Sequence, residues 1–170
     1  MILVTVGVHT MPFDRLLKAV DTVAATGGLD RHELVVQHGA SADLCKAGRR
    51  FAYCSGSELD ELLDHADLVI THGGIGTVLP ALRRRKHVIA IPRLSKYGEH
   101  YNDHQREVCA ELSERRALFT SPDANDLPRL LALDPTQLVP FQAPCTIVDR
   151  VREELRAFEH TLSTRRGWHR

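Results

Sequence analysis

The residues best suited to chemistry follow a short apolar run at 67–71 and read His72-Gly73-Gly74-Ile75-Gly76. Three glycines within four residues, set between a buried strand and a helical pattern, leave backbone N–H groups bare at a helix start. That helix end carries roughly half a positive charge, so the pattern is typical of an anion site, most often for phosphate. We expect the ring of His72 to donate a hydrogen bond to a phosphate oxygen; the alternative is an ordinary strand-to-helix turn with a capping histidine.

The composition argues against several classes of partner. Lys plus Arg and Asp plus Glu balance at 22 each, and aromatic residues make up only 5% of the chain, so we expect no nucleic-acid partner. The four cysteines form no C-x-x-C pair and no zinc-spaced cluster, which predicts reduced thiols in a cytoplasmic protein. No apolar run approaches the roughly 20 residues that a membrane helix needs, and the first residues read as a strand, not a signal peptide.

Alternating apolar and amphipathic patterns predict an α/β domain. Strands are expected at 1–6, 33–37, 51–54, 67–71, 88–91 and 117–120. Helices are expected from about Phe13 to Gly27, from a cap at Ser57, from the glycine turn to about Lys86, around Val108 to Leu112, and from Asn125 to Leu131. Ser57 and Asp60 have the spacing of a reciprocal capping box.

This pattern predicts a Rossmann-like, doubly wound, mostly parallel six-stranded sheet in the order 3-2-1-4-5-6. In that order the first and fourth strands are neighbours, so the loops at 7–10 and 72–76 face each other across one crevice. The expected organisation is a nucleotide-sugar-binding domain at 1–133, a linker at 134–145, a helix at 146–163 and a tail at 164–170.

Four separated motifs resemble the C-terminal, donor-binding domain of the family 28 glycosyltransferases, which have the GT-B fold. They are Val4-Thr5-Val6-Gly7-Val8-His9 with Pro12-Phe13-Asp14-Arg15, then Gln37-His38-Gly39, then Thr71-His72-Gly73-Gly74-Ile75-Gly76-Thr77, and last Pro92-Arg93 with Gly98-Glu99-His100-Tyr101-Asn102-Asp103-His104-Gln105. Together they are similar to small one-domain subunits of split glycosyltransferases. Such subunits occur in bacterial exopolysaccharide galactosyl- and glucuronosyltransferases and in the eukaryotic dolichol-linked N-acetylglucosaminyltransferase.

The resemblance implies an inverting hexosyltransferase of which only the donor-binding half is present. A separate, membrane-anchored subunit would bind the lipid-linked saccharide acceptor and hold this chain at the inner face of the membrane. The donor would be a nucleotide sugar, expected to be a UDP-sugar, acting as substrate, with no further cofactor. No metal is implied, because the helix N-terminus and His72 take the place of a cation; no Asp-x-Asp triplet occurs in the chain. Self-association is left open.

The same resemblance assigns roles to individual residues. The nucleotide diphosphate would be held by His72, Gly73, Gly74, Gly76 and Thr77, with Gly7 in the loop after the first strand. Asn102 and Gln105 would contact the donor sugar and line the interdomain cleft, because their amides can donate to and accept from sugar hydroxyls. The catalytic candidates are His9, Glu99 and His100, and the general base is either a histidine of this chain or a residue of the partner.

Two positions depart from the family pattern. Pro80 stands where many relatives place a glutamate that grips the ribose, and a proline fits near a helix start but cannot bind a ribose. The basic run 83–86 replaces a glycine; it suits a helix C-terminus, and the alternative is contact with anionic lipid.

Two rival functions and one docking question stay open. A nucleotide-sugar 2-epimerase shares the fold but needs both domains in one chain, and a non-catalytic regulatory subunit would explain Pro80. The helix at 146–163 carries an apolar stripe, which packs either on this domain or on the partner. The stripe consists of Val148, Val151, Leu155, Phe158 and Leu162.

Overall fold

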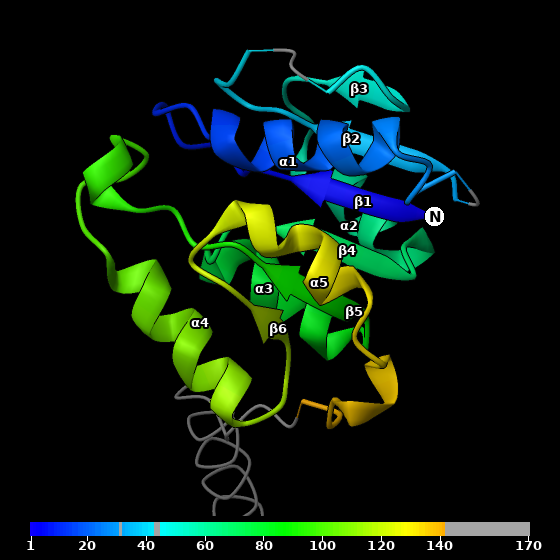
Figure 1. Cartoon of the computed structure of the whole chain (residues 1–170), viewed down its shortest axis with the longest axis vertical. Helices are drawn as coiled ribbons and strands as arrows, with labels where there is room; N and C mark the ends of the chain where they lie inside the picture. Colours follow the sequence, from blue (N-terminus) through cyan, green and yellow to red (C-terminus); the bar gives the residue numbers. More distant parts are fainter. Residues whose placement is uncertain (31, 43–44, 142–170) are drawn as a thin grey trace, which may run out of the picture.

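A computed structural model describes residues 1–30, 32–42 and 45–141 of the chain. Within them, six strands form one parallel sheet in the order β3-β2-β1-β4-β5-β6, which confirms the predicted order (Figure 1). The strands are β1 (Ile2–Thr5), β2 (Leu34–Gln37), β3 (Arg49–Phe51), β4 (Leu68–Thr71), β5 (His87–Ala90) and β6 (Phe119–Thr120).

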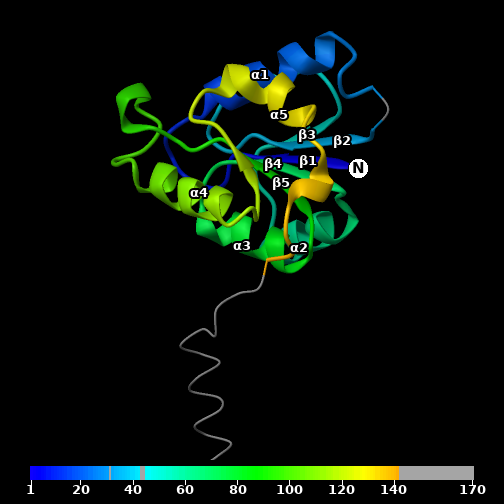
Figure 2. The same cartoon turned by 60° about the horizontal axis from the view of Figure 1, so that its bottom comes forward.

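Helices cover both faces of the sheet (Figure 2). The α-helices are α1 (Asp14–Ala25), α2 (Gly56–His65), α3 (Ile75–Arg83), α4 (His104–Glu114) and α5 (Leu127–Leu131). Three short 3-10 helices are η1 (Ser95–Tyr97), η2 (Ala124–Asp126) and η3 (Pro135–Gln137). Figure 2 shows α1 and α5 on one face of the sheet and α2, α3 and α4 on the other.

The central strands are apolar along their whole length because both of their faces are covered. In β1, Ile2 and Val4 pack into the core beneath α1 and α5, whereas Leu3 joins the core beneath α2, α3 and α4. This arrangement is the doubly wound fold expected from the sequence, with two hydrophobic layers separated by one sheet. It holds the carboxyl ends of β1 and β4 side by side, with Thr5 opposite Thr71.

Two local predictions were wrong. The third strand was expected at 51–54 but lies at Arg49–Phe51, where an edge strand with exposed arginines pairs with β2. The cap of α2 is Ser55, not Ser57: its hydroxyl accepts from the N–H of Glu58, whose carboxylate accepts from Ser55 N. Ser55 has the extended backbone of a cap, so this capping box is the one formed.

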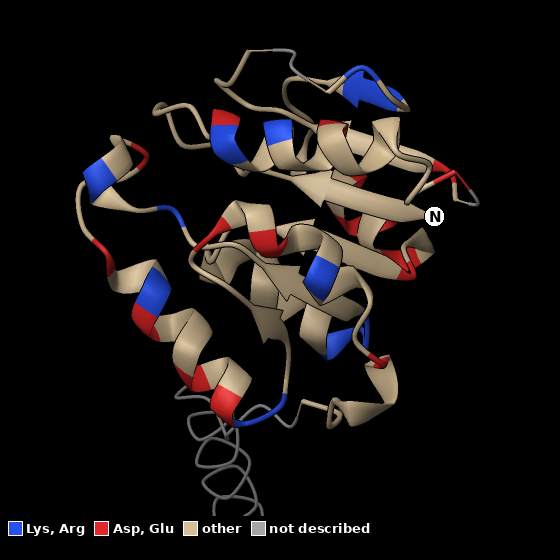
Figure 3. Cartoon of the chain, in the orientation of Figure 1, with Lys and Arg blue, Asp and Glu red and all other residues tan. Residues whose placement is uncertain are grey.

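The basic run at the end of α3 is tied to α2. Arg84 forms ion pairs with Asp60 and Asp64, both at 2.7 Å, and Lys86 Nζ donates to the Asp64 carbonyl. These contacts favour the helix-end interpretation of the run over lipid contact. Along α4, charges of both signs are interspersed (Figure 3).

The predicted linker falls partly, and the predicted helix at 146–163 and tail fall wholly, outside the described residues. Among the residues that the structure describes, no helix is long and apolar enough to cross a bilayer.

Candidate functional site

A pocket of about 270 Å³ lies at the carboxyl ends of β1, β2 and β4. It forms at the topological switch point, where ligands of doubly wound sheets bind. Its lining includes Gly7, Val8, Cys54, His72, Gly76 and Thr77. The two loops that the sequence predicted to face each other therefore do so.

The two helices that start at this pocket have different N-termini. Helix α2 begins with the complete capping box at Ser55, so Glu58 already places a carboxylate against its positive end. Helix α3 begins at Gly74 with no side-chain cap and no acidic residue in its first turn. Its leading N–H groups and its partial positive charge are therefore left for a ligand, and an anion suits both.

Gly7 and Gly74 lie on either side of the His72 ring and make room for it. A Cβ placed on Gly7 would lie 2.5 Å from Cε1 of His72, and one on Gly74 would overlap Nε2. Gly7 also has φ 78°, a backbone conformation that other residues rarely adopt. The imidazole is thus clamped between the first-strand loop and the start of α3, and neither glycine could carry a side chain without moving it.

The other two glycines of the motif, Gly73 and Gly76, differ in what surrounds them. A Cβ on Gly73 would lie 2.7 Å from Cys109 Sγ and 3.0 Å from Gln105 O, so Gly73 allows α4 to pack against the turn. A Cβ on Gly76 would meet nothing within 4 Å, and this residue lines the pocket. Only the last glycine therefore has the open surroundings expected where a ligand approaches the backbone.

His72 is a neutral imidazole in this setting. Burial, with the positive charge of Arg93 and the neighbouring rings of His100 and His9, lowers its pKa to about 4, although a hydrogen bond to the Thr5 backbone works the other way. Nδ1 lies 3.2 Å from the hydroxyl oxygen of Thr71, while Nε2 lies beside Gly74 at the start of α3. The ring therefore presents Nε2 where an anion at the helix end would be.

Gln37 fixes the Gly7 loop, a role that sequence reasoning missed although it noted the Gln37-His38-Gly39 motif. Its buried amide accepts from Gly7 N at 3.1 Å and donates to Gly7 O at 3.0 Å. The hydroxyl of Thr5 donates to the same amide oxygen at 2.6 Å. Gly39 lies directly behind, where a Cβ would come 2.8 Å from Gly7 O.

Arg93 connects two loops from inside the protein and was also missed. It is 1% exposed and donates to the carbonyls of Val6 at 2.7 Å, Met11 at 2.8 Å and Glu99 at 3.1 Å. Burial lowers its pKa to about 10, with Glu99 opposing, so the guanidinium stays charged at neutral pH. The loop after β1 and the loop after β5 are thereby held together.

Glu99 is buried in an ion pair. Its two carboxylate oxygens each accept from Arg15 at 2.9 Å, and one also accepts from Leu94 N at 3.0 Å. Arg15 additionally donates to the carbonyls of Pro92 and Pro122. These contacts favour a positioning role for Glu99 over the predicted catalytic one, because its acceptor sites are turned inward and already used.

Gln105 and Asn102 hold the segment before α4. The buried amide oxygen of Gln105 accepts from Arg93 N at 3.2 Å. The exposed Asn102 accepts with its side-chain oxygen from His104 N and contacts His104 Nδ1. Both predicted sugar-binding amides thus use their oxygens to shape this loop.

Aromatic rings from the loop after β1 and from the segment around the start of α4 lie against one another. The ring centroids of His9 and His100 are 4.9 Å apart, those of His9 and Tyr101 5.5 Å, and those of His100 and His104 5.1 Å. Nδ1 of His9 accepts from Met11 N at 3.1 Å, and Nδ1 of His100 accepts from Asn102 N at 3.3 Å. In their neutral forms both rings therefore carry the proton on Nε2, which is then a hydrogen-bond donor. Their catalytic role stays a prediction.

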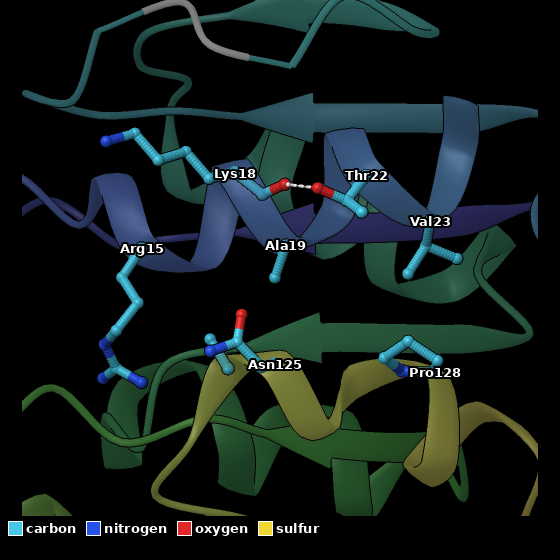
Figure 4. Close-up of a pocket in the computed structure, with 8 residues that line it drawn as sticks. Arg15, Lys18, Ala19, Thr22, Val23, Asn125 and Pro128 are labelled. Carbon is cyan, nitrogen blue, oxygen red and sulfur yellow. Dashed lines mark hydrogen bonds between the residues drawn. The ribbon is translucent and has the colours of Figure 1, made fainter. Parts of the chain in front are cut away.

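Two further features bear on where a ligand binds. Among the described residues, no group of three or more His, Cys, Asp or Glu side chains is arranged to hold a metal ion. A hollow of about 330 Å³ lies between α1 and α5, where Asn125 points toward α1 (Figure 4). No residue predicted to act in the site lines this hollow, so we assign the site to the smaller pocket.

Pro80 lies in the interior of α3 as its sixth residue, deeper than the helix start at which the sequence placed it. It lacks the N–H that would bond to the carbonyl one turn back, at Gly76. Pro80 itself does not line the pocket, so a longer side chain would be needed at this position to reach a ligand there.

One comparison with known proteins shows the family, and the others show similar proteins and folds. The model of the glycosyltransferase family 28 C-terminal domain matches residues 1–128. A curated relative, the UDP-N-acetylglucosamine transferase subunit ALG13 of Yarrowia lipolytica, is 29% identical over 150 residues, covering 78% of this chain and 70% of the relative. The NMR solution structure of ALG13 has a TM-score of 0.58 at 20% identity, over 91% of this chain and 93% of that one.

Larger solved structures share the fold. The glycotransferase of kitacinnamycin has a TM-score of 0.57 at 21% identity, and the match covers 80% of this chain but 35% of that enzyme. The UDP-GlcNAc 2-epimerase of Methanocaldococcus jannaschii, in complex with UDP-GlcNAc and UDP, has a TM-score of 0.56 at 16% identity over 92% and 45% of the two chains. The described pocket lies wholly within the residues matched by the family model, and the chain belongs to the family of glycosyltransferase family 28 C-terminal domains.

Proposed function

We propose that this chain is the donor-binding subunit of a two-component glycosyltransferase that moves a sugar from a nucleotide donor, a UDP-sugar, to a lipid-linked saccharide. One observation carries the proposal: the uncapped N-terminus of α3, the ring of His72 and the open backbone at Gly76 meet in one pocket. This combination suits a diphosphate, which needs N–H donors and close approach to the backbone.

The proposed dependence on a partner is supported by the relatives that this chain matches. The chain spans about a third of the length of the kitacinnamycin enzyme but 93% of the ALG13 structure, and the curated relative is named as a transferase subunit. His9 follows Val8 of the pocket lining, its ring lies against those of His100 and Tyr101, and Tyr101 is 76% exposed. We propose that a second, membrane-anchored polypeptide closes over this edge and binds the acceptor.

The transfer step assigns distinct tasks to the two halves. The acceptor hydroxyl attacks the anomeric carbon and loses its proton to a base, while the bond to the diphosphate breaks and the nucleoside diphosphate leaves with the charge. The helix end at Gly74 would stabilise that charge. Since neutral His9 and His100 donate through Nε2, we propose that they bind sugar hydroxyls and that the partner supplies the base.

The test uses the full chain with and without a co-expressed partner. Calorimetry of the chain alone should show weak binding of UDP, and membranes containing both polypeptides should transfer labelled sugar to lipid. Gly76→Leu, which fills the pocket beside an otherwise open backbone, is the matched inactive control. Binding of UDP without transfer by the assembled pair would indicate the regulatory subunit instead, and robust turnover by the chain alone would contradict the two-component proposal.

A further inference from the structure

The hydrogen bonds behind His72 determine which ring nitrogen carries the proton. The hydroxyl of Thr71 lies 3.0 Å from the carbonyl oxygen of Thr5, to which it donates. A hydroxyl has one hydrogen, so Thr71 has none left for the imidazole. The 3.2 Å contact between its oxygen and Nδ1 of His72 is then a hydrogen bond only if Nδ1 is the donor.

A neutral ring that is protonated on Nδ1 has a bare lone pair on Nε2. Nε2 is the atom nearest to a Cβ built at Gly74, and it is among the atoms nearest to one built at Gly7. Because the ring is clamped between these residues, it cannot turn over to exchange its two nitrogens without displacing backbone. A lone pair therefore faces the start of α3, where the proposed diphosphate would sit.

An anion and a lone pair repel each other, so the two can meet only if a proton comes between them. We propose that Thr71 is a positioning residue that fixes the Nδ1–H form of His72, and that binding of a nucleotide diphosphate is coupled to uptake of a proton from solvent at Nε2. The inference rests on the proposed function and adds a linkage between donor binding and pH. Departure of the nucleoside diphosphate would return the proton.

The surroundings of the ring agree with this coupling. The charged or titratable groups that act on it are Arg93 from the loop after β5, His100 from the segment before α4, and His9 from the loop after β1. All three disfavour a positive charge on the ring, and the hydrogen bond to the Thr5 backbone opposes them. From α4, Gln105 and Cys109 pack against Gly73, the residue after His72, and burial raises the pKa of the Cys109 thiol to about 11; His104 packs on His100. The two negative charges of a bound diphosphate would reverse that balance.

The first test reads the tautomer directly in the full chain without ligand. Long-range proton–nitrogen NMR of the imidazoles, with His72 identified by comparison with His72→Gln, should show a protonated Nδ1 and a bare Nε2 at neutral pH. Thr71→Ser, which keeps the hydroxyl, should preserve this pattern. Thr71→Val, which removes it, should raise the Nε2–H population. A wild-type ring protonated on Nε2 would overturn the inference even if Thr71→Val failed to fold.

The second test measures protons during binding of UDP-glucose, whose diphosphate has no proton that dissociates in this range. Calorimetry in two buffers of different ionisation enthalpy should show net uptake, with affinity roughly tenfold tighter for each unit of pH lowered between the bound and free pKa values. His72→Gln should bind without uptake, and Thr71→Val with less than the wild type. Binding without uptake by the wild type would refute the coupling alone, whereas no binding of any UDP compound would overturn the proposed function and this linkage with it.

Discussion

Replacing Gly74 with alanine tests whether the glycines exist to hold the His72 ring. The backbone at Gly74, with φ −75° and ψ 124°, is one that alanine adopts without strain, so the effect reports the clash with Nε2. The ring must tilt and lose its bond at Nδ1, which costs about 0.5–1.5 kcal/mol, and overpacking costs about 1–3 kcal/mol. We expect the free energy of unfolding to fall by about 1.5–4.5 kcal/mol and the Tm by about 3–18 °C.

Gly76→Ala is the matched control, because its Cβ meets no atom within 4 Å. An alanine in this first turn should leave stability unchanged or raise it by up to about 1 kcal/mol. Urea unfolding, monitored by far-UV circular dichroism, compares the stabilities of the two variants. Calorimetry then measures their affinity for UDP, which should be roughly 10- to 150-fold weaker in Gly74→Ala because the His72 ring is displaced. Equal urea midpoints for the two variants would refute the clamp.

Four further outcomes are expected. Between its ordinary pKa of 6.5 and about 4, His72 is charged only in the unfolded chain, so acidification through this window should lower the free energy of unfolding by up to about 3 kcal/mol relative to His72→Gln; parallel urea midpoints from pH 7 to pH 4 would contradict this. Glu99→Gln should cost about 3–5 kcal/mol in urea unfolding, because it leaves the Arg15 charge without its partner; a loss of transfer at full stability would instead restore the catalytic role. Arg93→Met should unfold at markedly lower urea, since four backbone carbonyls lose their guanidinium donor, and each buried one left unpaired costs about 1–3 kcal/mol. Pro80→Glu should stay folded and bind UDP more tightly, because it returns a helix N–H and a carboxylate for the ribose; weaker binding at an unchanged Tm would argue that the pocket has another shape.

The arrangement of the strands could be predicted from the sequence because it depends on patterns that are local and strong. The apolar runs of β1, β4 and β5 are buried on both faces, and right-handed crossovers then leave few orders for them. The loop pair at the pocket follows from that order alone. The cap of α2 could not be decided, since Ser55 with Glu58 and Ser57 with Asp60 offer the same spacing three residues apart.

The roles of individual residues in the site could not be predicted from the sequence, for a different reason. A glycine in a motif can make room either for a ligand or for a side chain of the same protein. Only the three-dimensional structure shows that Gly74 makes room for the His72 ring, whereas the space at Gly76 is open. Likewise, the charged residues of the motif after β5 suggested contact with substrate. Burial turned Glu99 and Arg93 inward instead, where their partners are carbonyls and an arginine far away in the sequence.

The buried guanidinium of Arg93 has a consequence for how such proteins diversify. Because one side chain donates to carbonyls of both the first-strand loop and the segment after β5, neither loop can change its backbone path independently. Grafting one loop from a relative should fail where grafting both succeeds, and substitutions in the two should be non-additive in double-mutant cycles. The two loops would then determine donor preference together, and a change of donor by engineering would require both loops to be exchanged at once.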